Sequence, residues 1–83
     1  MKVSIRYFAS IREAIGQSSE QRETSATTLA SLRDELLLAS PAHAAALARD
    51  KSVRMAIDQV MQGEATPITD GCEVAFFPPV TGG

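Results

Sequence analysis

The 83-residue chain is 45% hydrophobic and 22% charged, with a formal net charge of -2. This size and balance are typical of one small soluble globular domain and exclude an intrinsically disordered chain. The 8 Lys and Arg residues are scattered along the sequence, so a nucleic-acid partner is not expected. Every apolar run is far shorter than the roughly 18 residues of a membrane span, so no membrane association is expected either.

Cys72 is the only cysteine and His43 the only histidine. One cysteine cannot form an internal disulfide, which fits a reducing cytoplasm. The N-terminus lacks the long apolar segment of a signal peptide, so a cytoplasmic location is expected. His43 has no second ligand at a metal-binding spacing. It is therefore interpreted as a helix-surface residue, and no metal site is predicted.

The first 25 residues predict two strands with a helical turn between them. Polar and apolar side chains alternate over residues 2–8, as in a half-buried strand. Ser10 is expected to cap a short helix that Gly16 ends. Residues 17–25 are polar, which indicates an exposed edge strand paired with the first as a hairpin.

The next segment predicts the main helix. Thr27 or Thr28 can cap it, and Leu29, Leu32 and Leu36 form one apolar stripe at helical spacing. The charged residues that follow lie largely off this stripe. They are Arg33, Asp34 and Glu35, of which the last two are interpreted as solvated charges.

A second short helix and a third strand are expected before the end of the chain. Ser40 and Pro41 suit the start of a helix, and residues 42–48 are rich in alanine. Residues 53–58 alternate again and predict a strand. A turn that includes Met61 and Gly63 is expected after it.

The end of the chain predicts a strand followed by a thin tail. Asp70-Gly71 is a turn signal directly before the apolar residues 74–77. Two prolines stop the strand because they lack an N–H for the sheet, and they favour an extended, stiff segment. A glycine end is thin and conformationally free. Such a tail suits entry into a narrow active site on another protein, where it would deliver the carboxylate of Gly83. The tail comprises Pro78, Pro79, Val80, Thr81, Gly82 and Gly83.

The order strand, strand, helix, strand, strand predicts an α+β roll, in which a mixed sheet packs on one main helix. The first and last strands are expected to form a central parallel pair. The predicted division is a folded domain over residues 1–77 and a flexible tail over residues 78–83.

The ending Phe-Pro-Pro-Val-Thr-Gly-Gly after Asp-Gly resembles that of the molybdopterin synthase small subunit family, which has the ubiquitin-like β-grasp fold. Residues 7–13 and 55–58 resemble the same family, and the resemblance spans the whole chain. Two positions depart from the family pattern. Cys72 stands where an acidic residue is usual, and Asp58 where asparagine is usual, which leaves the roles of both positions open.

The resemblance implies a sulfur carrier that is not an enzyme on its own. An E1-like adenylating enzyme would use ATP to join AMP to Gly83, so the chain itself would bind no cofactor. Sulfur from a persulfide donor would then replace AMP and leave a thiocarboxylate. Residues 78–82 would carry it into the large catalytic subunit, within a heterotetramer. There it would give sulfur to cyclic pyranopterin monophosphate during molybdenum cofactor biosynthesis.

A partner surface is predicted from alternation rather than from the family. Phe8 and Phe77 both fall out of step with the buried faces of their strands. Neighbouring strands would place both on the outer face near the root of the tail, where Met61 is expected to join them. Exposed aromatic residues of this kind mark interfaces. Cys72, next to an acidic residue, is interpreted as a strand-start side chain rather than a nucleophile.

Other functions stay open at this point. A ubiquitin-like modifier would use the same activation of Gly83 but join it to lysines. A sulfur carrier for the thiamine thiazole is also possible, although the Phe-Pro-Pro segment argues against it. A stand-alone hydrolase is the weakest alternative, because one His and one Cys without partners make no triad.

Overall fold

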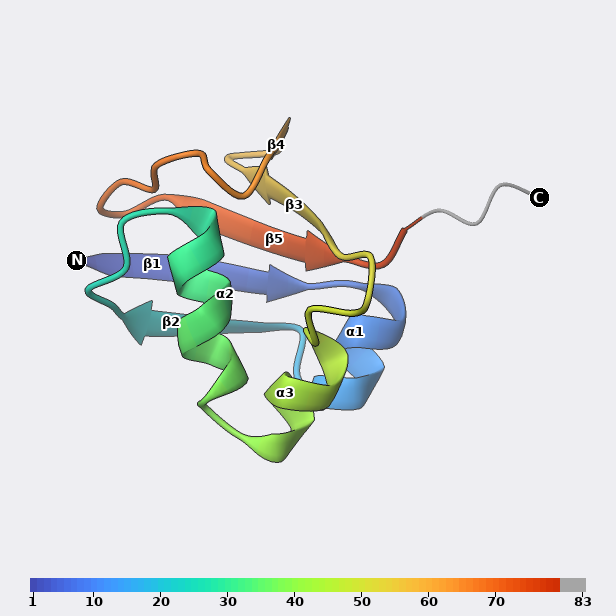
Figure 1. Cartoon of the computed structure of the whole chain (residues 1–83). Helices are drawn as coiled ribbons and strands as arrows, with labels where there is room; N and C mark the ends of the chain where they lie inside the picture. The colour runs from blue at the N-terminus through green and yellow to red at the C-terminus, as the bar shows by residue number, and fades with distance from the viewer. Residues whose placement is uncertain (80–83) are drawn as a thin grey trace.

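A computed structural model describes residues 1–79, and the predictions made for Val80, Thr81, Gly82 and Gly83 lie outside the described residues. The strands and helices over residues 1–79 are, in chain order, β1 (Lys2–Tyr7), α1 (Ala9–Ile15), β2 (Ser19–Glu23), α2 (Leu29–Leu37), α3 (Pro41–Ala46), β3 (Arg54–Ile57), β4 (Val60–Gln62) and β5 (Glu73–Phe77). They form a mixed sheet with α2 and α3 on one face, as Figure 1 shows.

The central parallel pair is confirmed. The sheet order is β2-β1-β5-β3-β4, and β1 lies parallel to β5 with Ile5 opposite Val74 and Tyr7 opposite Phe76. All four side chains are at most 1% exposed, so the pair forms the floor of the core. The predicted hairpin of β1 with the polar edge strand β2 is also confirmed.

The main helix α2 lies across the sheet as the leucine stripe predicts. Thr28 caps it: its side chain accepts a hydrogen bond from the Ser31 N–H, and Ser31 bonds back to the Thr28 backbone. Leu29, Leu32 and Leu36 are fully buried. Within residues 1–79, none of the helices combines the length and the apolar character needed to cross a membrane.

The start of α1 differs from the prediction. Ser10 lies inside the helix, and Phe8 occupies the cap position without a side-chain cap bond. The chain passes from β1 almost directly into α1, so the Phe8 carbonyl already accepts hydrogen bonds from the N–H groups of Ile11 and Arg12. Gly16 ends the helix with a φ of 89°, as predicted.

The sequence predicted four strands, and the structure has one more, β4. Met61 lies in this strand rather than in a turn. Asp58 and Gln59 have φ values of 49° and 71°, which form a tight hairpin turn between β3 and β4. The pair is not the Asn-Gly or Asp-Gly signal that usually marks such turns, and three exposed residues show little alternation. For these two reasons the sequence did not predict β4.

The sequence suggested that His43 is a helix-surface residue, and this prediction is wrong. His43 is buried and belongs to a polar cluster. Its Nε2 lies 2.9 Å from Glu20 Oε2 and its Nδ1 lies 2.7 Å from Ser40 Oγ. The hydroxyl of Tyr7 donates to the same Glu20 oxygen at 2.8 Å. Burial alone would raise the pKa of Glu20, but hydrogen bonds from His43 and Tyr7 outweigh it and hold that pKa below its ordinary value. The cluster joins α3 to β1 and β2.

Glu35 is likewise not a free solvated charge. It accepts hydrogen bonds from Arg22 Nε at 2.6 Å and from Thr24 Oγ1 at 2.8 Å. Burial opposes ionisation of this carboxyl, but the bonds to Arg22 and Thr24 hold its pKa below the ordinary value. The contact ties α2 to the end of β2.

Candidate functional site at the root of the C-terminal tail

The tail leaves the sheet from a firmly held strand. On one side of β5 the Phe8 N–H donates to the Phe76 carbonyl at 3.1 Å, and on the other side Arg54 of β3 lies opposite Phe77. Pro78 follows at once and ends the ladder because it has no N–H. Pro78 is half-buried and Pro79 exposed. The segment Phe77–Pro79, which we call the tail root, therefore begins on a rigid base.

Phe8 and Phe77 lie together on the outer side of the tail root, as strand alternation predicts. Their ring centroids are 6.0 Å apart with an interplanar angle of 82°, a favourable edge-to-face arrangement. Phe8 is 39% exposed, and the Arg6 guanidinium lies 5.6 Å from the centre of its ring. An aromatic pair, with Phe8 exposed and Phe77 half-buried, is thus fixed beside the tail.

Met61 shares the outer face with this aromatic pair. It lies opposite Ala56 on β3, which in turn lies opposite Ala75 on β5. Residues that face each other across strands project to the same side, and so do Ala75 and Phe77, two positions apart. Met61 is 50% exposed. We refer to Phe8, Met61 and Phe77 as the outer-face patch.

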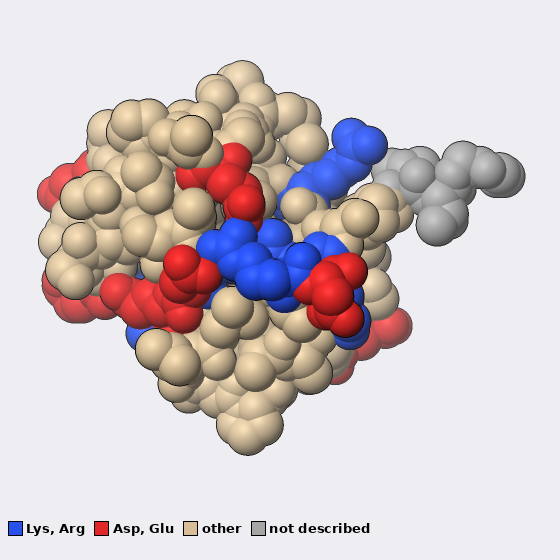
Figure 2. Space-filling view, viewed as in Figure 1, with Lys and Arg blue, Asp and Glu red and all other residues tan. Residues whose placement is uncertain are grey.

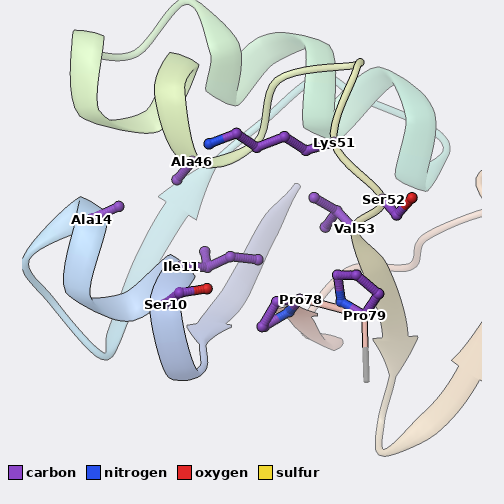
Figure 3. Close-up of a pocket in the computed structure, with 9 residues that line it drawn as sticks. All are labelled: Ser10, Ile11, Ala14, Ala46, Lys51, Ser52, Val53, Pro78 and Pro79. Carbon is purple, nitrogen blue, oxygen red and sulfur yellow. The ribbon is translucent and has the colours of Figure 1, made fainter. Parts of the chain in front are cut away.

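A hollow lies on the opposite, helix-bearing side of the tail root. It has a volume of about 530 Å³ and opens between α1, α3, the segment 51–53 and the two prolines (Figure 3). Its apolar lining comprises Ile11, Ala14, Ala46, Val53, Pro78 and Pro79. Its polar lining comprises Ser10, Lys51 and Ser52. In Figure 3 the Lys51 side chain extends along the hollow toward Ala46.

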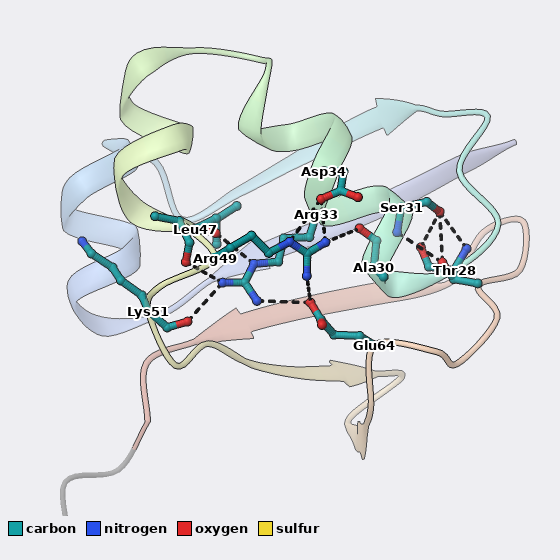
Figure 4. Close-up of polar contacts among 10 residues, drawn as sticks. Thr28, Ala30, Ser31, Arg33, Asp34, Leu47, Arg49, Lys51 and Glu64 are labelled. Atoms are coloured by element: carbon teal, nitrogen blue, oxygen red, sulfur yellow. Dashed lines mark hydrogen bonds and ion pairs between the residues drawn. The ribbon is translucent and has the colours of Figure 1, made fainter.

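Arg33 fixes the segment that forms one wall of the hollow (Figure 4). This residue lies off the leucine stripe yet is only 4% exposed. Its guanidinium donates to the carbonyl oxygens of Leu47 at 2.9 Å, Ala48 at 2.7 Å and Lys51 at 3.2 Å, and it pairs with Glu64 at 3.2 Å. The irregular chain after α3 has carbonyl groups that need donors, and Arg33 supplies them. We call this set of contacts the Arg33 clasp.

Arg49 extends the clasp at the surface. It donates to Asp34 at 2.6 Å and to the Ala30 carbonyl at 3.0 Å, and it also pairs with Glu64. The hydrogen bond to Asp34 raises the pKa of Arg49 above its ordinary value. Figure 2 shows basic side chains gathered near the centre of the helix-bearing face with acidic groups on both sides. The charges are mutually satisfied, so this cluster is structural.

Cys72 and Asp58, the two positions that depart from the family pattern, both have a structural role in the fold. Cys72 is a free cysteine that is 3% exposed and directly precedes β5, which agrees with a strand-start side chain. Asp58 Oδ1 accepts a hydrogen bond from the Glu73 N–H at 2.9 Å, and the Asp58 N–H donates to the Glu73 carbonyl at 2.8 Å. Asp58 thus ties the β3–β4 turn to the start of β5.

The sequence placed Phe8 and Phe77 together on the outer face but did not reveal the hollow or the clasp. The partner-interface role assigned to Phe8, Met61 and Phe77 stays a prediction. No group of three His, Cys, Asp or Glu side chains in residues 1–79 could hold a metal ion. The reacting group assigned to Gly83, and the insertion role assigned to the tail, stay predictions. The division into a domain over 1–77 and a tail over 78–83 also stays a prediction.

Known proteins are similar to this chain in sequence and in fold over nearly all of its length. The ThiS family matches residues 5–83. The molybdopterin synthase sulfur carrier subunit of Escherichia coli (strain K12) is 37% identical over 81 residues, with 98% of this chain and 99% of that protein covered.

Two solved structures confirm the ubiquitin-like β-grasp fold. SAMP1 from Haloferax volcanii has a TM-score of 0.79 at 22% identity, and the match covers 100% of both chains. A chain of the complex of subunits 1 and 2 of molybdopterin-converting factor from Helicobacter pylori 26695 has a TM-score of 0.69 at 24% identity, also over 100% of both chains. Taken with the sequence matches, these findings show that the chain belongs to the ThiS family and is a homologue of molybdopterin synthase sulfur carrier subunits.

Proposed function

We propose that the chain is the sulfur carrier subunit of molybdopterin synthase and donates sulfur from its C-terminus without being a catalyst on its own. The observation that carries this proposal is the full-length similarity to a relative of that name, at 37% identity. The family match also extends through Gly83, the residue to which the proposal assigns the chemistry.

The proposed chemistry takes place on the Gly83 carboxyl group. Its oxygen attacks the α-phosphorus of ATP on an E1-like enzyme, pyrophosphate leaves, and an acyl adenylate forms. A persulfide sulfur attacks the acyl carbon and AMP leaves. A thiol then cleaves the S–S bond to give the thiocarboxylate, whose sulfur is a better nucleophile than a carboxylate oxygen. The sulfur attacks cyclic pyranopterin monophosphate on the large subunit, and water then cleaves the acyl carbon–sulfur bond, which leaves sulfur on the pterin and regenerates the Gly83 carboxylate.

The structure supports delivery by a tail on a rigid base. β5 is held by β1 and β3 on its two sides, and the two prolines restrict the backbone, which lowers the entropy lost when the tail enters a pocket. Four residues follow Pro79, and an extended segment of that length reaches at most about 14 Å. This reach suits a reacting atom placed deep in the pocket of a partner.

The proposed partners are the large catalytic subunit, the E1-like enzyme and a persulfide donor in the cytoplasm. The Helicobacter pylori structure holds subunits 1 and 2 of molybdopterin-converting factor together, and we extend that association to this chain as a heterotetramer. The outer-face patch is the proposed contact surface. Its residues are apolar side chains on the outer face near the tail, of which Phe8 and Met61 are exposed and Phe77 is half-buried, as expected of interface anchors.

A ubiquitin-like modifier is the second candidate. The name SAMP1 stands for small archaeal modifier protein 1, and the Haloferax volcanii protein has the same fold as this chain. The fold alone therefore does not separate a carrier from a modifier. The two functions differ in the acceptor, which is a pterin for a carrier and a lysine for a modifier.

Reconstitution with purified components tests the proposal. The chain is incubated with the E1-like enzyme, ATP and a persulfide donor, and then with the large subunit and cyclic pyranopterin monophosphate. The carrier proposal predicts a mass gain equal to one oxygen replaced by sulfur, followed by molybdopterin formation. A ladder of conjugates with lysine-bearing proteins, without molybdopterin, would favour the modifier.

A further inference from the structure

The tail root has two accessible sides, and the outer-face patch accounts for only one of them. On the other side the hollow of about 530 Å³ is bordered by Pro78 and Pro79 themselves. A tail that enters a narrow pocket is surrounded by the rim of that pocket. The rim must therefore meet both sides of the root, including the side that carries the hollow.

The lining of the hollow defines the chemistry of what fits it. Its floor is apolar, with Ile11 and Ala46 each only 4% exposed. Among the described residues that line the hollow, Lys51 alone is charged, and no carboxylate accompanies it. An apolar side chain next to a carboxylate would thus bury apolar area and pair with the ammonium group.

The wall that carries Lys51 is held in place before any partner binds. The carbonyl of Lys51 accepts a hydrogen bond from Arg33 at 3.2 Å, and the carbonyl of Ala48 accepts another at 2.7 Å. The donor is a buried guanidinium with four acceptors, which is a rigid support. A preformed wall reduces the ordering entropy lost on association.

We propose that the hollow is a docking site for the rim of the tail pocket on the large synthase subunit, and that it receives an apolar side chain flanked by a carboxylate. The proposal rests on the carrier function proposed above. It adds a contact site on the helix-bearing side, so that the large subunit grips the tail root between the hollow and the outer-face patch.

Filling the hollow tests the apolar part of the proposal. Ala14 is an exposed α1 residue that lines the hollow, so Ala14→Trp would occupy it without disturbing the core. The matched control is Ala45→Trp, at an exposed α3 residue outside the lining. We expect Ala14→Trp to weaken binding to the large subunit from the same organism by about tenfold or more, while Ala45→Trp binds like the unmodified chain.

Reversing the charge of Lys51 tests the polar part. Lys51→Glu should weaken binding severalfold at low salt, with the difference shrinking at high salt because the pair is exposed. The control is Lys2→Glu, an exposed lysine at the opposite end of β1 from the tail root. The melting temperature of every variant is measured as well, and we expect each to equal that of the unmodified chain. This control shows that a loss of binding does not come from a loss of folding.

The outcomes distinguish this proposal from the function on which it rests. If the unmodified chain does not bind the large subunit, both fail. If it binds and Ala14→Trp binds equally well, only the hollow is wrong. Two other occupants are checked in the free chain. A shift of the Gly82 and Gly83 NMR signals in Ala14→Trp would place the chain's own tail in the hollow, and dimers abolished by Ala14→Trp would place a second copy there. Either result would overturn the proposal.

Discussion

Two pairs of aromatic residues lie on opposite faces of the sheet and have different roles. The residues of the second pair directly follow those of the first in the sequence. Tyr7 and Phe76 lie 6.2 Å apart on the helix-bearing face and are 1% and 0% exposed. Their neighbours Phe8 and Phe77 lie 6.0 Å apart on the outer face, where Phe8 is 39% exposed. Aromatic residues at neighbouring positions, at the end of β1 and the end of β5, therefore hold the fold on one face and offer a contact surface on the other.

The largest expected effect is loss of the inner pair. Phe76→Ala would leave a cavity in the buried core next to Tyr7, and we expect the free energy of unfolding to fall by about 3–5 kcal/mol. For a domain of this size such a loss approaches the whole stability. Chemical denaturation monitored by circular dichroism would measure it. A fall in the free energy of unfolding of less than about 1 kcal/mol would show that packing of Phe76 does not hold the core together.

Truncation of the outer pair should have the opposite signature. We expect Phe77→Ala to weaken binding to the large subunit by about 2 kcal/mol, or roughly thirtyfold, with little loss of thermal stability. Titration calorimetry and melting curves of the same sample would check both halves. Full affinity together with a large drop in melting temperature would place Phe77 in the core and remove the basis for the outer-face patch.

Cys72 offers a smaller effect that separates folding from sulfur chemistry. Because the thiol is buried before β5, Cys72→Ser places a hydroxyl in an apolar site and should cost about 1–2 kcal/mol of stability. Gain of sulfur at the C-terminus should be unchanged, since Gly83 is proposed to carry it. Thiocarboxylate formation assayed at a temperature where the variant stays folded decides the matter, and loss of sulfur there would make Cys72 a sulfur relay.

The smallest expected effect concerns acid stability of the inner face. Glu20 accepts a hydrogen bond from the Tyr7 hydroxyl. The pKa of Glu20 lies below the ordinary glutamate value, and so does the pKa of Glu35. A lowered pKa in the folded state gives stability that is present above about pH 4.3, the usual glutamate value, and is lost as the pH falls through the folded pKa. We expect Glu20→Gln to be less stable than the unmodified chain at neutral pH, with a difference that narrows below about pH 4. A difference that stayed constant with pH would contradict this assignment.

Local sequence signals predicted most of the framework, although they missed β4 and misplaced the cap of α1. Alternation placed Phe8 and Phe77 on one face, turn residues placed the start of β5, and Thr28 and Ser40 were identified as helix caps. Each of these signals depends on a few neighbouring residues. The prolines and glycines at the end of the sequence predicted a thin tail that delivers the Gly83 carboxylate, whereas the sulfur chemistry came from resemblance to a family.

Contacts between distant residues were not predictable in the same way. His43 meets Glu20 across 23 positions, and Arg33 meets the loop carbonyls across 14 to 18 positions. Both side chains are polar and lie in helices, where solvent exposure is the usual outcome. His43 finds its partner because α3 packs next to β2, and Arg33 finds its partners in the chain that follows α3.

The central claim is that Gly83 carries the sulfur, and intact-mass spectrometry tests it most directly. The unmodified chain and a variant lacking Gly83 are each incubated with the E1-like enzyme, ATP and a persulfide donor. We predict that the unmodified chain gains the mass of one oxygen replaced by sulfur, located at Gly83 by fragmentation. The variant should stay unmodified with an unchanged melting temperature, because the strands, helices and core of the described residues end by Phe77. A variant that gained sulfur as readily as the unmodified chain would contradict the account.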